Sequence, residues 1–276
     1  MSLNSVNTNV GAMIALQNLN AITGELRVVQ DRISTGLKVA SAKDNPAVWA
    51  IAQNQRGESR ALNAVMSSLQ RGQSVVDVAM SAGESISDIL LQMKEKMLAA
   101  SEPGLTADSL QALNADYVAL RKLIDTTANN AEFNGISLIS SGSAGKIRAL
   151  ANTSASSTID VDHVDLSAST GILSGLRANL LATILPSSMT DMNQAISDVS
   201  AAMSRLGTGS KALDSHLTFV QKLQDTIDAG IGNLVDADVA KESARLQALM
   251  VRQQLAIKAL SIANSAPSML LQLFRF

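Results

Sequence analysis

The sequence contains no cysteine and very few aromatic residues. The lack of cysteine excludes disulfides and thiolate metal sites. Aromatic residues make up 2% of the 276 residues, although hydrophobic residues make up 46%. A globular enzyme core usually draws much of its buried area from Phe, Tyr and Trp. This composition therefore favours apolar helical stripes of Ala, Leu, Ile, Val and Met over a compact enzyme core.

Charge and long apolar runs are also scarce. The formal net charge is −2 and no basic cluster occurs, which argues against nucleic acid as a partner. No uninterrupted apolar run is long enough to span a bilayer, so no membrane insertion is expected. The start, Met1-Ser2-Leu3-Asn4, has no basic residue followed by an apolar run, so no Sec-type signal is predicted. If the protein is exported, another route must carry it.

What the sequence does contain is a 3-4 spacing of apolar residues, in residues 62–97 and again in 192–234. Such spacing keeps one stripe of a helix facing one partner, which is typical of a coiled-coil seam. The two repeats therefore predict two long helices that pack against each other. The predicted seam includes Leu62, Leu69, Val76, Ile86, Leu90, Met93 and Met97 in the first repeat, and Val199, Leu206, Leu213, Leu217 and Val220 in the second.

Both ends of the chain are apolar and poor in charge. Residues 1–24 carry no charged side chain, and beyond Gln253 only Lys258 and Arg275 are charged. Apolar positions continue at helical spacing, from Leu3 and Val6 in the first segment to Leu255 and Leu260 in the last. Each end is predicted to be helical. It either packs within its own domain or is buried against other copies of the chain.

Glycine, proline and small polar residues mark where the predicted helices begin and end. Asn-Gly is a turn signal, and the Ser-, Gly- and Thr-rich residues 140–170 contain short apolar runs at 146–150 and 157–166. Alternation in the second run predicts a small β-hairpin. The expected helix boundaries are Gly36, Asp44 or Asn45 before Pro46, Glu102-Pro103-Gly104, Thr106 or Asp108, and Asp236 or Asp238. The predicted fold class is mainly α, a long antiparallel coiled-coil helical rod with a small β-hairpin region in the middle of the chain.

Few residues are of a type and spacing that would support catalysis or the binding of a metal or phosphate. His163 lies near Asp160, Asp162 and Asp165, but solvated carboxylates are the stronger interpretation of that cluster than a metal site. The segment 207–211 has two glycines and a lysine, yet it lacks phosphate-loop spacing and lies inside a seam. The sequence therefore predicts no catalytic residue, no metal and no cofactor.

Three signature segments and the final helix resemble bacterial flagellin, the subunit of the flagellar filament. Residues 33–47 are similar to its N-terminal signature, Glu132-Phe133-Asn134-Gly135 to its mid-chain turn, and residues 236–242 to its C-terminal signature. Residues 254–273 resemble its final helix. The resemblance implies a self-assembling structural subunit of the extracellular filament that drives swimming. A hook–filament junction protein or a secreted effector would share the periodicity but not the signatures.

The resemblance also implies an organisation and a set of partners. Residues 1–45 and 235–276 would form an inner-tube coiled coil. Residues 46–234 would form a rod, with a hairpin and loop region at about 134–188 and no large outer domains. The expected partners are other copies in a helical homopolymer, the flagellar cap and hook–filament junction proteins, and an export chaperone that masks residues 246–273. Type III export would replace a cleaved signal. Val48-Trp49 and the ending Phe274-Arg275-Phe276 fit the alphaproteobacterial branch of the family.

One motif of the family departs from its usual form in this chain. In relatives that a vertebrate innate receptor senses, the first long helix carries a motif that matches residues 91–98 here. Met93 stands where the family's key arginine would lie, and Met97 where its leucine would lie. Methionine offers a soft apolar contact in place of five hydrogen-bond donors, so weak receptor activation is expected.

Overall fold

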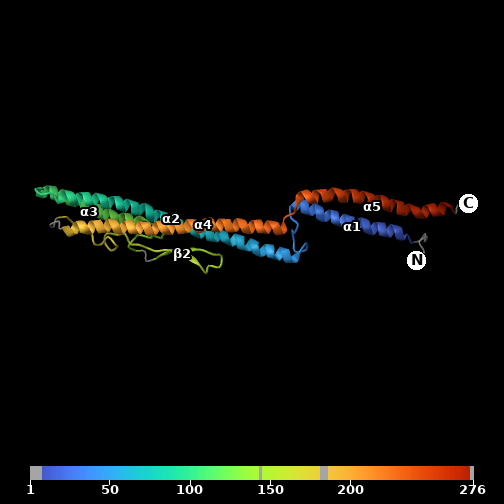
Figure 1. Cartoon of the computed structure of the whole chain (residues 1–276), viewed down its shortest axis with the longest axis horizontal. Coiled ribbons are helices and arrows are strands. Elements are labelled where there is room, and N and C mark those ends of the chain that lie inside the picture. The colour runs from blue at the N-terminus through green and yellow to red at the C-terminus, as the bar shows by residue number, and fades with distance from the viewer. Residues whose placement is uncertain (1–7, 143–144, 181–185, 274–276) are drawn as a thin grey trace. The chain divides into compact units, whose positions relative to one another are not determined.

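The computed structural model describes residues 8–142, 145–180 and 186–273, with the side chains of the last helix described as far as Ser265. These residues form five helices and a two-stranded antiparallel sheet (Figure 1). The mainly α fold with a small hairpin is therefore confirmed. The elements are α1 (Val10–Thr35), α2 (Pro46–Ala100), α3 (Ala107–Asn130), β1 (Ile147–Leu150), β2 (Thr158–Val161), α4 (Pro186–Val235) and α5 (Val239–Leu273).

The chain forms two compact units. The smaller contains Met1–Gly57 and Thr226–Phe276, and the larger contains Glu58–Asp225. The predicted roles of an inner tube and a rod concern the assembled state and remain predictions. Among the described helices, none is both long and apolar enough to cross a membrane. The predicted apolar positions Leu3 and Val6 lie outside the described residues.

The helix boundaries follow the predicted signals and decide between the alternatives. Gly36 ends α1 with φ 70°, a left-handed conformation that glycine adopts without strain. The side-chain oxygen of Asn45 accepts a hydrogen bond from the backbone N–H of Val48 at 3.1 Å, so Asn45 caps α2. Thr106 caps α3 and Asp238 caps α5 in the same way, through the N–H groups of Ser109 and Lys241.

The two predicted seams pack against each other in the larger unit. Every position of the first repeat is buried, and every position of the second is buried or half-buried. The Gln224 side chain donates to the carbonyl oxygen of Ser59 at 3.2 Å. Further along, Gly72 faces Leu213 and Gly83 faces Met203. Because residue numbers rise along α2 as they fall along α4, the two helices are antiparallel, as predicted.

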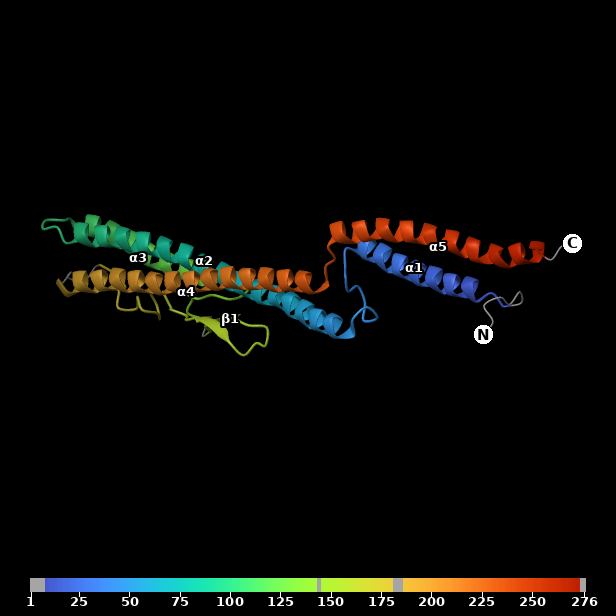
Figure 2. The same cartoon turned by 45° about the vertical axis from the view of Figure 1, so that its right-hand side comes forward.

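The structure contains the predicted hairpin, but its second strand, β2, is shorter than the apolar run at 157–166. Ile147 pairs with Val161 and Leu150 pairs with Thr158, so β2 ends at Val161. Beyond it, the N–H groups of Val164 and Leu166 donate to the carbonyls of Leu138 and Ile139. Figure 2 shows the strands lying along the helices of the larger unit. Ile147 and Ala149 are buried, and their methyl groups lie 3.4–3.5 Å from the position a Cβ would take at Gly72.

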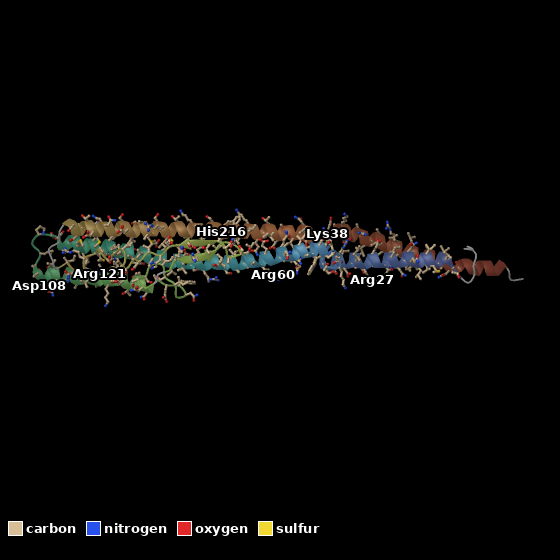
Figure 3. The ribbon with its side chains drawn as sticks, turned by 90° about the horizontal axis from the view of Figure 1, so that it is seen from below. Arg27, Lys38, Arg60, Asp108, Arg121 and His216 are labelled. Atoms are coloured by element: carbon tan, nitrogen blue, oxygen red, sulfur yellow. The ribbon has the colours of Figure 1, made fainter. Side chains whose placement is uncertain are left out.

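The segment between the hairpin and α4 is also part of the core, although the sequence did not predict it. Leu166, Leu173 and Leu180 are each no more than 1% exposed. Polar side chains of α3 hold this segment in place. Arg121 donates to the carbonyl of Ala168 at 2.6 Å, Asp125 accepts from the N–H of Ala168 at 2.7 Å, and Asn114 accepts from the N–H of Leu180 at 2.7 Å (Arg121 is labelled in Figure 3).

Tyr117, in the same face of α3, is fully buried, and its hydroxyl has no hydrogen-bond partner among the described residues. An unpaired buried polar group costs about 1–3 kcal/mol. Tyr117→Phe is therefore expected to raise the free energy of unfolding by about 1 kcal/mol. Denaturant unfolding of the full chain at pH 8 would measure the change. A variant less stable than the wild type would contradict it.

The phenol adds a pH dependence. Burial raises the pKa of Tyr117 from 10.0 to about 12, although Arg121 and Arg177 oppose the shift. Between these values the unfolded chain loses the phenolic proton while the folded chain keeps it, so stability falls as pH rises. Tyr117→Phe should remove this contribution to the fall of the free energy of unfolding with pH. Because Tyr117 is the one tyrosine of the chain, the tyrosinate absorbance reports its ionisation directly.

Candidate functional site

The smaller unit pairs the two ends of the chain, α1 and α5, around a thin apolar core. Leu26 and Val29 of α1 and Leu249 of α5 are the buried members, and partly buried hydrophobic residues surround them. A second small cluster, built around Val39, Ala52, Ile231 and Val235, lies where the helices meet the connecting segments. The surrounding residues of the first cluster are Ile22, Ile33 and Leu246.

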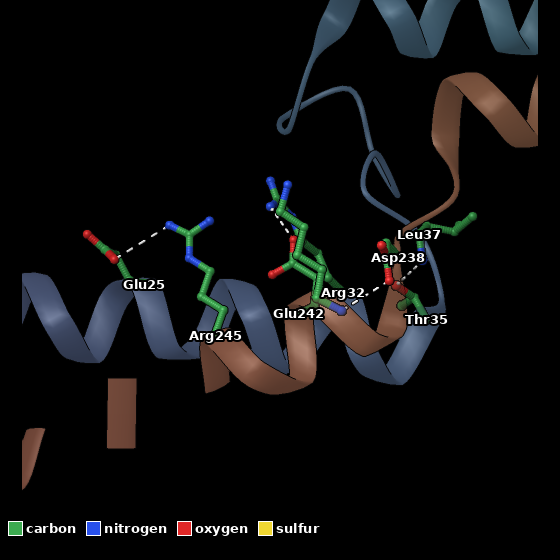
Figure 4. A network of polar contacts seen from close by, with 8 residues as sticks. Glu25, Arg32, Thr35, Leu37, Asp238, Glu242 and Arg245 are labelled. Atoms are coloured by element: carbon green, nitrogen blue, oxygen red, sulfur yellow. Dashed lines mark hydrogen bonds and ion pairs between the residues drawn. The ribbon is translucent and has the colours of Figure 1, made fainter. Parts of the chain in front are cut away.

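Two ion pairs join α1 to α5 (Figure 4). Arg32 Nη1 lies 3.1 Å from Glu242 Oε1, and both side chains are mostly shielded from solvent. Arg245 and Glu25 form a longer pair at 3.7 Å with both side chains half exposed, where an ion pair contributes little. The Arg32–Glu242 pair joins the last turn of α1 to the first turn of α5.

The signature segments of the sequence turn out to build the connection between the helices. The carboxylate of Asp44 accepts hydrogen bonds from the backbone N–H groups of Ala40 and Ser41, at 3.1 and 2.9 Å. These bonds lower the pKa of Asp44, and the bond from the Ser41 N–H has the largest effect. The N–H of Lys38 donates to the carbonyl of Val235 at 2.6 Å. The N–H of Ala237 donates to the carbonyl of Gly36 at 2.8 Å, so the segment between α1 and α2 is tied to the segment between α4 and α5.

Much of the apolar surface of α1 and α5 is left exposed. Leu255 is 63% exposed and Leu260 is half-buried. An open groove of about 600 Å³ runs between the two helices, lined mainly by small and apolar residues such as Ala15, Ala21 and Ala259. The other large exposed apolar side chains of the two helices are Val10, Met13, Ile14, Leu16, Val28, Val239, Met250, Val251, Ile257 and Ile262.

The structure therefore separates the predicted assembly residues into two groups. Those of the seams lie inside the larger unit, where Leu217 is half-buried and the others are buried. In the smaller unit, in contrast, Leu255 is exposed and Leu260 is half-buried. Met93 and Met97 are 0% and 1% exposed, so both receptor-motif positions face the seam. The buried seam residues are Leu62, Leu69, Val76, Ile86, Leu90, Val199, Leu206, Leu213 and Val220.

His163 and the segment 207–211 make ordinary structural contacts. Nε2 of His163 lies 2.9 Å from the carbonyl oxygen of Ser140. The described residues contain no group of three His, Asp or Glu side chains placed to hold a metal ion. Gly207 and Gly209 lie within α4, and Gly209 faces Val161 of the hairpin. A helical glycine that accommodates a strand explains the sequence of this segment.

Sequence reasoning missed the exposed apolar residues of the mid-chain turn. Phe133 and Ile136 are 40% and 45% exposed on either side of Asn134-Gly135. The two outer residues exchange backbone hydrogen bonds at 2.9 and 3.1 Å, and both central residues have positive φ. The Asn-Gly signal predicted the turn, but no sequence signal told which way its apolar residues point.

Comparisons with known proteins agree over the whole chain. Residues 6–144 match the bacterial flagellin N-terminal helical region, and residues 189–274 match the bacterial flagellin C-terminal helical region. The chain is 51% identical to flagellin FljK of Caulobacter vibrioides, with 100% of both chains covered. It is 33% identical to the flagellin of Brucella melitensis, with 98% of this chain and 99% of that one covered. A solved structure, a putative flagellar hook-associated protein from Vibrio parahaemolyticus, covers 70% of this chain with a TM-score of 0.59 at 16% identity, which is a likeness of fold alone.

Proposed function

Because the chain belongs to the bacterial flagellin family and is a structural subunit of the extracellular flagellar filament, we propose that α1 and α5 carry the contacts between its copies. Full-length identity to flagellins decides against a junction protein, an effector or an enzyme. The interpretation as a short flagellin of alphaproteobacterial type is confirmed as well.

The observation that carries the proposal is the exposed apolar surface of α1 and α5. Contiguous apolar patches of this kind are costly in water and mark interaction surfaces. Buried apolar area stabilises an assembly by about 25 cal/mol per Å². Residues 10–24 carry no charge that would have to be desolvated on contact.

Leu255→Asp tests the proposal. Leu255 is 63% exposed, so the monomer should unfold within about 1 kcal/mol of the wild type. A carboxylate buried between copies would cost several kcal/mol, so elongation from filament seeds should fall by about a hundredfold or more. Leu255→Met keeps an apolar side chain of similar volume and should elongate normally. Elongation of Leu255→Asp at the wild-type rate would refute the proposal.

The same surface suits the remaining expected partners. We propose that an export chaperone covers the exposed apolar side chains of α5 before assembly, of which Val251, Leu255 and Ile262 are the most exposed. The predicted chaperone segment, 246–273, extends past the last described side chain. Contacts with cap and hook–filament junction proteins would use the same ends, since those proteins must continue the subunit lattice.

We also propose that the vertebrate receptor which senses many flagellins recognises this chain weakly. Met93 and Met97 are buried in the seam, and neither supplies a cation. A reporter-cell dose response to monomer should be shifted by about tenfold or more from that of a strongly sensed flagellin. Equal potency would overturn this expectation.

A further inference from the structure

A second groove lies on the larger unit, beside the mid-chain turn. It measures about 240 Å³ and is bordered by α2, the turn at 133–136 and β1. Three cationic side chains, Arg71, Lys146 and Arg148, line it, and no carboxylate is among its described lining residues. Phe133 and Ile136 stand at its rim, 40% and 45% exposed. The groove thus combines positive charge with an apolar edge.

Among the residues that the structure describes, little neutralises this charge. Asp160 is the carboxylate that pairs with two of the cations, at 2.7 Å to Lys146 Nζ and 3.7 Å to Arg148 Nε. Arg71 is exposed on α2 and forms no ion pair with any residue that the structure describes. Asp160 pairs with two of the three cations and leaves Arg71 without a carboxylate among the described residues, so the groove suits a ligand that brings further carboxylates.

The chain carries a segment of the matching kind at the turn between α2 and α3. Glu102 and Asp108 are both exposed there, and Leu98, in the last turn of α2, is 61% exposed. Pro103 and Gly104, with φ 94° at Gly104, fix a tight turn that protrudes where the two helices reverse direction. Figure 3 shows Asp108 at that end of the helices. A convex acidic turn with an apolar neighbour complements a concave cationic groove with an apolar rim.

We propose that the groove beside the mid-chain turn receives the turn between α2 and α3 of a second copy of this chain. The inference rests on self-assembly into a filament and adds a contact in the larger unit. The two surfaces differ, so the contact is heterologous and repeats from copy to copy without closing, as an open filament requires. Glu102 of one copy pairs with Arg71 of the next, and Leu98 lies against Phe133 and Ile136.

A charge exchange tests the pairing in the full chain. Arg71→Glu should slow seeded elongation by about tenfold, because it places like charges in contact. Since every copy carries both surfaces, Arg71→Glu with Glu102→Lys should restore the rate to within about twofold. Arg71→Glu with Asp214→Lys, an exposed acid on α4, restores nothing. Wild-type elongation of Arg71→Glu, or equal behaviour of the two double variants, would overturn the proposal.

The absence of natural cysteine allows a second test on assembled filaments. Arg148→Cys and Glu102→Cys in one chain should yield a ladder of disulfide-linked multimers on mild oxidation, whereas each single variant should not. Filaments that form without a ladder would reject this contact and leave the proposed role of α1 and α5 untouched. Failure of that role would appear instead as normal elongation of Leu255→Asp.

Discussion

Leu90→Asp is expected to unfold the larger unit. Leu90 is 0% exposed in the seam of α2, with Ile86 and Met93 buried one turn away on either side. The substitution removes a buried leucine, which costs about 2–5 kcal/mol, and buries a carboxylate without a partner, which costs several more. Domains of this size are stable by only about 5–15 kcal/mol, so little or no folded unit should remain.

The neighbouring residue supplies a matched control. Leu91 is 53% exposed, so Leu91→Asp makes the same chemical change one position away but outside the seam. It should alter the free energy of unfolding by no more than about 1 kcal/mol. Thermal unfolding followed by circular dichroism would compare the two, and seeded elongation would report assembly. If Leu90→Asp unfolds at the same temperature as the wild type, the seam does not hold the larger unit together.

The long helices were predictable because their burial repeats along the chain. A residue such as Leu69 or Leu213 reveals its environment through neighbours three and four positions away, and those neighbours lie in the same helix. For a similar reason, the sequence narrowed the N-terminal caps of α2, α3 and α5 to one of two residues each. Asn45 and Asp238 act on N–H groups only three positions ahead.

The core between the hairpin and α4 could not be predicted in this way. Leu166 and Leu173 are buried, but they lie in a segment that forms neither helix nor strand, so no helical or strand period could predict their burial. The contacts that fix the segment, such as Arg121 to Ala168, join residues 47 positions apart. Nor could the sequence tell a buried leucine from an exposed one, since Leu90 and Leu255 have the same helical spacing but opposite exposure.

This difference in exposure leads to an expectation about the free subunit. In α1, the residues before Ile22 include no buried side chain, and in α5 no described residue after Leu249 is buried. Ordering a residue costs about 1–2 kcal/mol, and long helices in proteins depend on packing one face. Residues 10–21 and 253–265 are therefore expected to exchange their amide hydrogens rapidly in the dilute monomer. In filaments the same amides should be protected by about a hundredfold or more.

Hydrogen exchange of monomer and filament, resolved by peptide, would measure this coupling of folding to assembly. The amides of residues 62–97 provide the internal control, because the seam packs within one chain and should be protected in both states. In the monomer, the amides of residues 26–33, next to Leu249 and the Arg32–Glu242 pair, should be protected more than those of residues 10–21 and less than those of the seam. Protection of residues 10–21 in the monomer at the level of the seam would show that α1 and α5 hold each other without a second copy.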